Sequence, residues 1–187
     1  DPTDPSSAVT ISNYGTETLT WIEDNEGCEN EASIDVTFFE IPVADAGDDI
    51  SICGLETELE GQLSIGTGTW DSPAGVTVID LNDAGSTIST DTYGTYTLTW
   101  TETSNGCEDN DMVDVSFLEV PVADAGPDEN LCIESSLDLS AMGGGTYTWS
   151  PTDGLDDANI ANPEASPTET TTYTVLVELE NGCSSSD

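Results

Sequence analysis

The sequence predicts an all-β chain, built as a tandem array of β-sandwich domains arranged as a rod. Three observations support this fold class. Residues 14–47 recur 79 residues later as residues 93–126, with 21 of 34 aligned positions identical. Within the repeat, apolar and polar residues alternate with the period of a half-buried strand. Clusters of turn-forming residues separate the alternating runs, and no amphipathic helical pattern occurs. A period of about one small domain indicates a repeat architecture.

The repeat divides the chain into three parts. Residues 1–42 align with the second half of a repeat, so the chain is expected to begin inside a domain. Residues 43–121 form one complete repeat. Residues 122–187 begin a third repeat and are expected to lack its last strand.

The complete repeat is expected to contain seven short strands, which fits a sandwich of two antiparallel sheets. Tyr96, Leu98 and Trp100 share one face of the clearest strand, and a turn near Gly106 follows it. The tryptophans are interpreted as core residues, although exposed aromatics such as Tyr147 could instead bind glycans. The expected strands span residues 49–53, 57–62, 66–71, 76–80, 86–89, 94–103 and 112–119.

Composition restricts the possible chemistry severely. The chain has no Lys, Arg or His and 39 acidic residues, which gives a formal charge of −39. Nucleic acids and anionic membranes are bound chiefly through Lys and Arg, so neither is an expected partner. Catalysis by imidazole or amine is excluded, which leaves carboxylate pairs of the glycosidase kind. Because the acidic residues recur with the repeat and line turns, we expect no enzyme and no catalytic residues here.

The five cysteines fall into two classes. Cys53 matches Cys132 at the repeat offset, whereas Cys28, Cys107 and Cys183 form the second class. One early and one late cysteine per repeat predict the disulfides Cys53–Cys107 and Cys132–Cys183, with Cys28 unpaired because its repeat is cut. Such bridges suit an oxidising, extracellular setting. Free buried thiols are the alternative, and a zinc site has neither a CxxC pair nor a histidine to support it.

Acidic turns supply candidate calcium ligands. Calcium binds carboxylate and carbonyl oxygens, and so many carboxylates without a cationic side chain repel one another in a compact domain. Bound cations would relieve that repulsion and stiffen the junctions, although each turn alone can equally be solvated. No turn has the full spacing of an EF-hand. The candidate ligands are Asp45, Asp48, Asp49, Asp124, Asp128, Glu129, Asp153, Asp156 and Asp157, and two further acidic clusters are Asp80 with Asp83 and Glu108 with Asp109 and Asp111.

Single prolines stand at both boundaries between repeats. Residues 38–43 and 117–122 pass from one repeat into the next through Pro42 and Pro121, without a Gly/Ser linker. Proline has a fixed φ and no N–H donor, so these residues are expected to end one strand and restrain the next domain. Protection of a strand edge is a second role that the same prolines can fill.

The third repeat carries a family resemblance. Trp149 is followed by SPTDGL, then NP, SPTETTTYTV and NGC, and this pattern resembles the PKD-like, immunoglobulin-type repeats of secreted proteins from gliding Bacteroidota. Among these, the array is most similar to the large acidic SprB-type adhesins exported by the type IX secretion system. The third repeat departs from the second, because Val177 aligns with Trp100 and different packing is expected there.

The resemblance implies a stalk or adhesive filament at the cell surface, attached to the outer membrane. Neighbouring repeats of the same chain, the gliding or secretion machinery and surface polysaccharide are the partners that it implies. No direct membrane insertion is expected. The alternative function is that of accessory or glycan-binding modules in a secreted enzyme, which the flanking sequence would distinguish.

Overall fold

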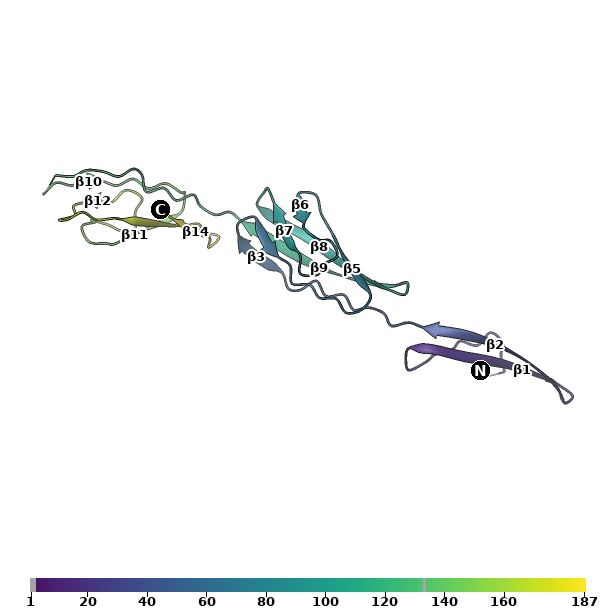
Figure 1. Cartoon of the computed structure of the whole chain (residues 1–187). Helices are drawn as coiled ribbons and strands as arrows, with labels where there is room; N and C mark the ends of the chain where they lie inside the picture. The colour runs from purple at the N-terminus through teal and green to yellow at the C-terminus, as the bar shows by residue number, and fades with distance from the viewer. Residues whose placement is uncertain (1–2, 133) are drawn as a thin grey trace.

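The computed structural model describes residues 3–132 and 134–187, and these residues form strands and turns without a helix. The first two residues of the expected segment 1–42 lie outside this description. Figure 1 shows three β-structured parts following one another along a single line, from the N-terminal hairpin to the C-terminal domain. The predicted all-β fold is therefore confirmed. No helix in the described part of the chain has the length and apolar character needed to cross a bilayer.

The first part is a long hairpin. Strands β1 (Gly15–Asn25) and β2 (Cys28–Phe38) pair antiparallel along their whole length, from Gly15 opposite Phe38 to Asn25 opposite Cys28. Trp21 on this hairpin is half-buried.

The second part is a complete sandwich. One sheet has the strand order β3-β9-β8-β5 and the other has the order β4-β7-β6, with β3 parallel to the second half of β9. This is the arrangement of an immunoglobulin-type domain, in which two sheets enclose one core. All seven expected strands are present: β3 (Ile50–Cys53), β4 (Glu56–Glu58), β5 (Thr67–Asp71), β6 (Val76–Val78), β7 (Thr87–Thr90), β8 (Gly94–Ser104) and β9 (Cys107–Leu118).

Aromatic side chains dominate the core of the second domain. The Trp70 and Trp100 rings lie 5.1 Å apart between centroids, and both side chains are almost fully buried. The Tyr96 hydroxyl donates to the Thr92 carbonyl at 3.1 Å, in the manner of the tyrosine corner of immunoglobulin domains. Trp149 occupies the equivalent place of Trp70 in the third domain and is equally buried. The predicted core role of these three tryptophans is confirmed.

The third part repeats this plan with shorter strands. Its two sheets are β11-β13-β14 and β10-β12, and Trp149, Val175 and Val177 belong to a separate core. The strands are β10 (Leu137–Asp138), β11 (Thr146–Ser150), β12 (Glu164–Ala165), β13 (Thr174–Glu178) and β14 (Ser184–Ser186).

The register of the third domain corrects the alignment of Val177 with Trp100. Trp70 lies opposite Trp100, whereas Trp149 lies opposite Val175, so Val175 holds the position of Trp100. Val177 instead holds the position of Glu102. The alignment failed because it matched the Tyr-Thr dipeptides at residues 96–97 and 173–174. Cross-strand pairing, which sets the register, differs from that match by two residues.

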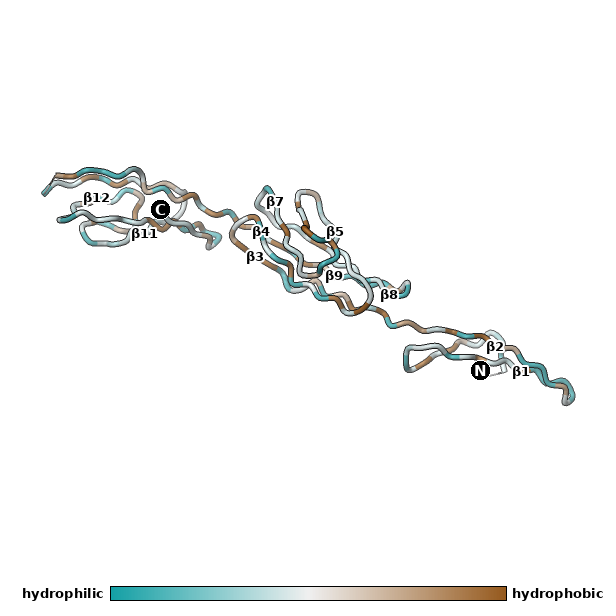
Figure 2. Tube along the Cα trace, in the orientation of Figure 1, coloured by the Kyte–Doolittle hydropathy of each residue, from teal (hydrophilic) through white to brown (hydrophobic). Residues whose placement is uncertain are grey.

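Figure 2 shows how hydropathy is distributed along the array. The turns of the β1-β2 and β8-β9 hairpins are hydrophilic, whereas the segments that connect the parts are hydrophobic. Pro42 and Pro121 are buried within these connections. The connections are therefore packed segments of the fold, unlike solvated linkers.

Candidate functional site: the junction between the second and third domains

The connection between the second and third domains is hydrogen-bonded to side chains at the C-terminal end of the chain. The Ser185 hydroxyl donates to the Pro121 carbonyl at 2.7 Å and accepts from the Ala123 N–H at 3.0 Å. The Asp187 carboxylate accepts from the Ala125 N–H at 2.8 Å. Because each bond joins the entering segment to the final strand of the same domain or to Asp187, which follows that strand, the entry angle of the third domain is restrained.

The second domain holds its own entering segment in the same way. The Asp109 carboxylate accepts from the Ala44 N–H at 3.0 Å, and the Asp111 carboxylate accepts from the Ala46 N–H at 2.9 Å. Two members of the acidic cluster at residues 108–111 are thus acceptors for backbone N–H groups.

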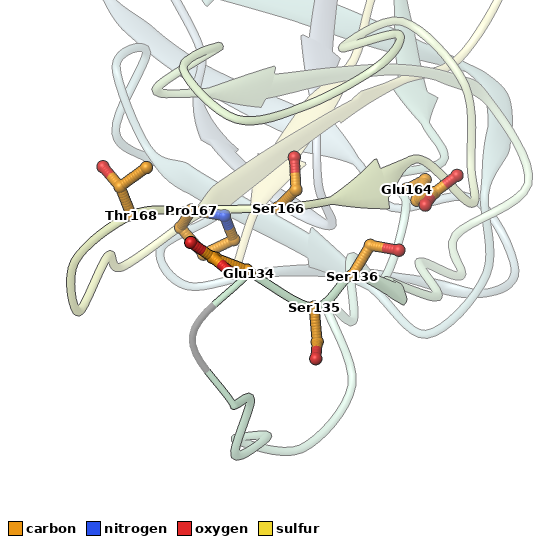
Figure 3. A pocket seen from close by; sticks show the side chains of 7 residues that line it. All are labelled: Glu134, Ser135, Ser136, Glu164, Ser166, Pro167 and Thr168. Atoms are coloured by element: carbon orange, nitrogen blue, oxygen red, sulfur yellow. The ribbon is translucent and has the colours of Figure 1, made fainter.

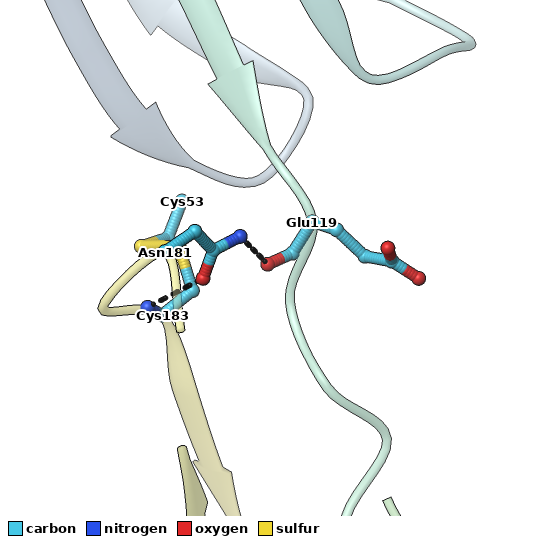
Figure 4. The surroundings of a disulfide bond; sticks show 4 residues. All are labelled: Cys53, Glu119, Asn181 and Cys183. Carbon is cyan, nitrogen blue, oxygen red and sulfur yellow. Dashed lines mark hydrogen bonds between the residues drawn. A yellow bond between two sulfur atoms is a disulfide. The ribbon is translucent and has the colours of Figure 1, made fainter. Parts of the chain in front are cut away.

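A disulfide crosses the junction. Cys53, at the end of β3 in the second domain, is bonded to Cys183 in the hairpin turn of the third, with 5.6 Å between the Cα atoms. Figure 4 shows Asn181 beside this bond: its side-chain amide donates to the Glu119 carbonyl at 2.9 Å, and its carbonyl oxygen accepts from the Cys183 N–H at 2.9 Å. Asn181 is the first residue of the NGC motif of the third repeat, but the motif alone does not predict this contact.

This bond corrects the predicted pairs Cys53–Cys107 and Cys132–Cys183. Cys53 lies opposite Leu118 at one end of β9, whereas Cys107 begins that same strand. At a rise of about 3.3 Å per residue, the two cysteines are separated by about 36 Å, far beyond the reach of a disulfide. Cys28, Cys107 and Cys132 are free thiols. Repeat spacing alone could not show that early and late cysteines lie at opposite ends of a domain.

The disulfide closes a loop with a sequence separation of 130 residues. On the chain-entropy estimate, a closed loop of this length stabilises the folded state by about 5 kcal/mol. Because the loop contains parts of both domains, this stabilisation applies to the docked pair.

Three of the six predicted calcium ligands near the junctions cap backbone groups. Asp45 accepts from the Gly47 N–H at 3.0 Å, and Asp124 accepts from the Gly126 N–H at 2.8 Å. Asp49 accepts from the Asp114 N–H at 3.0 Å. Such contacts explain why short acidic residues recur at these turns.

The remaining candidate ligands are dispersed. Asp156 accepts from the Asp157 and Glu164 N–H groups, and Asp157 accepts from the Asn159 N–H. Asp48, Asp128, Glu129 and Asp153 use no side-chain hydrogen bond within the described residues. No three His, Cys, Asp or Glu side chains of the described residues gather closely enough to hold a metal ion. Calcium binding therefore stays a prediction that rests on charge.

The hollow that Glu134 and Glu164 line has no converging pair of carboxylates. This hollow of about 470 Å³ on the third domain is lined by the two carboxylates together with serines, a proline and a threonine. Figure 3 shows Glu134 beside Pro167 and Glu164 on the opposite side of the group. The carboxylates thus do not face one another across a common point. Tyr147, the candidate glycan platform, packs against the core of the third domain and accepts from the Gly144 N–H.

Glu102 is a buried carboxylate that sequence reasoning missed. Its oxygens accept hydrogen bonds from the Ser64 N–H and hydroxyl, from the Ile65 N–H, and from the Trp100 indole at 3.1 Å. Burial raises the pKa of Glu102, but the bonds from Ser64, Trp100 and Ile65 outweigh it and hold the pKa below the usual 4.5. In the third domain, Gly143 and Val177 take the positions of Ser64 and Glu102. Both members of this hydrogen-bonded pair are therefore replaced together by residues without a polar side chain.

Replacing Glu102 is expected to destabilise the second domain in a pH-dependent way. At pH 7, Glu102→Gln should lower the free energy of unfolding by about 2 kcal/mol, because an amide N–H₂ then faces other donors. The folded-state pKa is the lower one, so the stabilisation is present at neutral pH and is lost as the pH falls below 4.5. The difference between native and variant should therefore shrink in acid, measured by urea unfolding with tryptophan fluorescence.

Glu108→Gln is the matched control, because it removes the same charge from an exposed side chain. It should change stability by less than about 0.5 kcal/mol. Equal losses in both variants at pH 7 would show that Glu102 contributes through net charge alone.

Comparison with known proteins identifies no family for this chain. No family model matches the chain, and no curated protein matches it. Among solved structures, it is similar to a three-domain immunoglobulin segment of titin, with TM-score 0.46, 10% identity, and coverage of 95% of this chain and 74% of that chain. For extracellular domains 3–5 of Drosophila OTK, the corresponding values are 0.45, 11%, 96% and 70%. For immunoglobulin domains 1–5 of Sidekick-1, they are 0.38, 16%, 96% and 46%. With TM-scores below 0.5, these likenesses carry no argument about activity or partners.

Proposed function

We propose that this chain is part of the stalk of a large secreted adhesin or filament at the cell surface, and that it acts as a spacer without enzymatic activity. The contacts at the junction carry this proposal: a disulfide and Asn181 join consecutive domains end to end, and Ser185 holds the connection between them. A device that fixes one domain on the next serves reach and stiffness. A disulfide also favours an oxidising location outside the cytosol.

The charge supports the same role. A formal charge of −39 without any cationic side chain makes identical stalks repel one another and discourages edge-to-edge pairing of their strands. The resemblance to gliding-motility adhesins adds a candidate setting, in which the stalk is exported by the type IX secretion system and attached to the outer membrane. Its partners there are the neighbouring repeats, the gliding or secretion machinery and surface polysaccharide.

The cell surface is the place to test this function. Antibodies against residues 43–121 should label intact cells of the source organism, and a protease that cleaves after acidic residues should remove the label. Deleting repeats from the full-length gene should shorten surface filaments in proportion. Label that appears after permeabilisation alone would contradict a surface stalk, and unchanged filament length after deletion would contradict a spacer.

Calcium is proposed as an accessory that stiffens the junctions by neutralising repelling carboxylates. Calorimetry of the chain, first with calcium and then with excess chelator, measures this effect. A melting temperature that rises with calcium and falls again with chelator supports it, and an unchanged melting temperature removes calcium from the proposal.

A further inference from the structure

We propose that Cys107 and Cys132 are further inter-repeat disulfide sites, so that Cys53–Cys183 is one rung of a covalent ladder. In this ladder, the early cysteine of each repeat is bonded to the late cysteine of the next. Cys107 is then bonded to the early cysteine of the preceding repeat, and Cys132 is bonded to the late cysteine of the following repeat. The inference rests on the proposed function, because it requires further repeats on both sides.

The free cysteines Cys107 and Cys132 hold the same positions in the repeat as the bonded ones. Cys132 follows Cys53 at the repeat offset. Cys107 follows an Asn-Gly turn between β8 and β9, as Cys183 follows the Asn-Gly turn after β13. The same structural position in the same domain type presents its sulfur toward the same neighbour.

The direction of the hairpins supports this assignment. In Figure 1, the turn of the β8-β9 hairpin points toward the N-terminal part, and the turn between β13 and β14 points toward the second domain. The late cysteines in these two turns, Cys107 and Cys183, therefore lie on the side of their domain that faces the preceding part of the chain. Cys53 lies at the end of β3, on the side that faces the following repeat, and Cys132 holds the same repeat position in the third domain, in a segment that forms no strand.

Pairing within a domain is excluded by the same geometry. Cys53 and Cys107 lie near opposite ends of β9, about 36 Å apart at the rise of a strand. Bonding them requires the Cα atoms to approach within about 7 Å, which would need the sandwich to unfold.

The two junctions in the chain form a natural comparison. At the second, Asn181 donates to the carbonyl of Glu119, and the cysteines are bonded. At the first, Asn105 and Glu40 hold the equivalent positions, but residues 1–42 contain no early cysteine. Asn105 there donates to the neighbouring Ser104 hydroxyl. The Asn-Gly-Cys turn thus contacts the preceding domain through its asparagine at the junction where both cysteines are present.

The chemistry is a thiol–disulfide exchange with an oxidised protein dithiol catalyst. One thiolate attacks the catalyst disulfide to give a mixed disulfide, and the second cysteine then displaces the catalyst. The products are one inter-repeat S–S bond and a reduced dithiol catalyst, which has taken up the two electrons and the two thiol protons. Each rung consumes one such catalyst disulfide.

The first measurement is made on the chain as it stands. Alkylation followed by digestion after acidic residues and mass spectrometry should find Cys53–Cys183 and thiols at Cys28, Cys107 and Cys132. Recovery of Cys53–Cys107 and Cys132–Cys183 peptides would overturn the inference.

The second measurement adds a repeat. A variant carrying a second copy of residues 43–121 directly before residue 43, in place of residues 1–42, should form a new bond between the copied Cys53 and Cys107. The added copy contains both sheets and all residues of one core, so it is a complete domain. In this variant, Cys107→Ser should free the copied Cys53 and leave Cys53–Cys183 intact.

A copied Cys53 that stays a thiol, or that bonds to the copied Cys107, would overturn the ladder. That outcome is independent of surface labelling and filament length, so a failed ladder and a failed stalk function are distinguishable.

Discussion

When the oxidised chain is stretched from its two ends, about 450 Å of contour length is expected to stay unextended, and to become extensible once Cys53–Cys183 is reduced. The value follows from a sequence separation of 130 residues and about 3.5 Å per extended residue. Tension enters through the strand that ends at Cys53, crosses the disulfide and leaves after Cys183. Residues 54–182 then carry no load, even if they unfold. Optical-tweezers extension with and without a reductant measures the difference.

Single cysteine variants make this prediction specific. Cys53→Ser should release the whole hidden length without a reductant, whereas Cys107→Ser should leave the oxidised extension unchanged. If Cys107→Ser instead lengthens the oxidised chain by about 190 Å, the bond lies within the second domain, because that length corresponds to the segment between Cys53 and Cys107. In a ladder with a rung at every junction, the same bypass would make a long stalk nearly inextensible.

Gly68→Ala is expected to destabilise the second domain by about 3 kcal/mol. A Cβ atom at Gly68 would overlap the six-membered ring of Trp100, which is fully buried and packs on Trp70. Moving a ring of that size disrupts a close-packed core. For a domain of this length, the loss lowers Tm by at least about 12 °C. Calorimetry measures the shift.

Gly85→Ala is the matched control, because its Cβ would meet neighbouring atoms at ordinary distances of 3.7 and 3.8 Å. It should change Tm little. In a Trp100→Val background, Gly68→Ala should cost less than about 1 kcal/mol, since the obstructing ring is gone. The third domain shows the same exchange, with Tyr147 in the place of Gly68 and Val175 in the place of Trp100. Equal destabilisation in both backgrounds would contradict the overlap with Trp100.

The local patterns predicted most of the fold because they report on local physics. Alternation along residues 94–103 shows which face of that one strand is buried. Large apolar side chains such as Trp70 and Trp149 are buried whichever elements pack around them. The turn at Gly106 needs a positive φ, which the structure gives as 83°. These features need no knowledge of distant parts of the chain.

The candidate site was less predictable because its contacts depend on register. Asp45, Asp124 and Asp156 are candidate calcium ligands that also accept backbone N–H groups, a role that acidic composition does not reveal. Glu102 was overlooked because one carboxylate among 39 carries no local signal of burial. Its partner Ser64 lies 38 residues away.

By itself, the sequence determined the repeat, the strands, the buried tryptophans and the exclusion of chemistry that needs Lys, Arg or His side chains, because each follows from residue type and spacing. The tertiary structure alone decided which sulfurs meet. Parallel pairing of β3 with the end of β9 puts Cys53 and Cys107 near opposite ends of a strand, and the next domain then brings Cys183 to Cys53. Spacing along the chain carries no information about the end of a domain at which a residue finally lies.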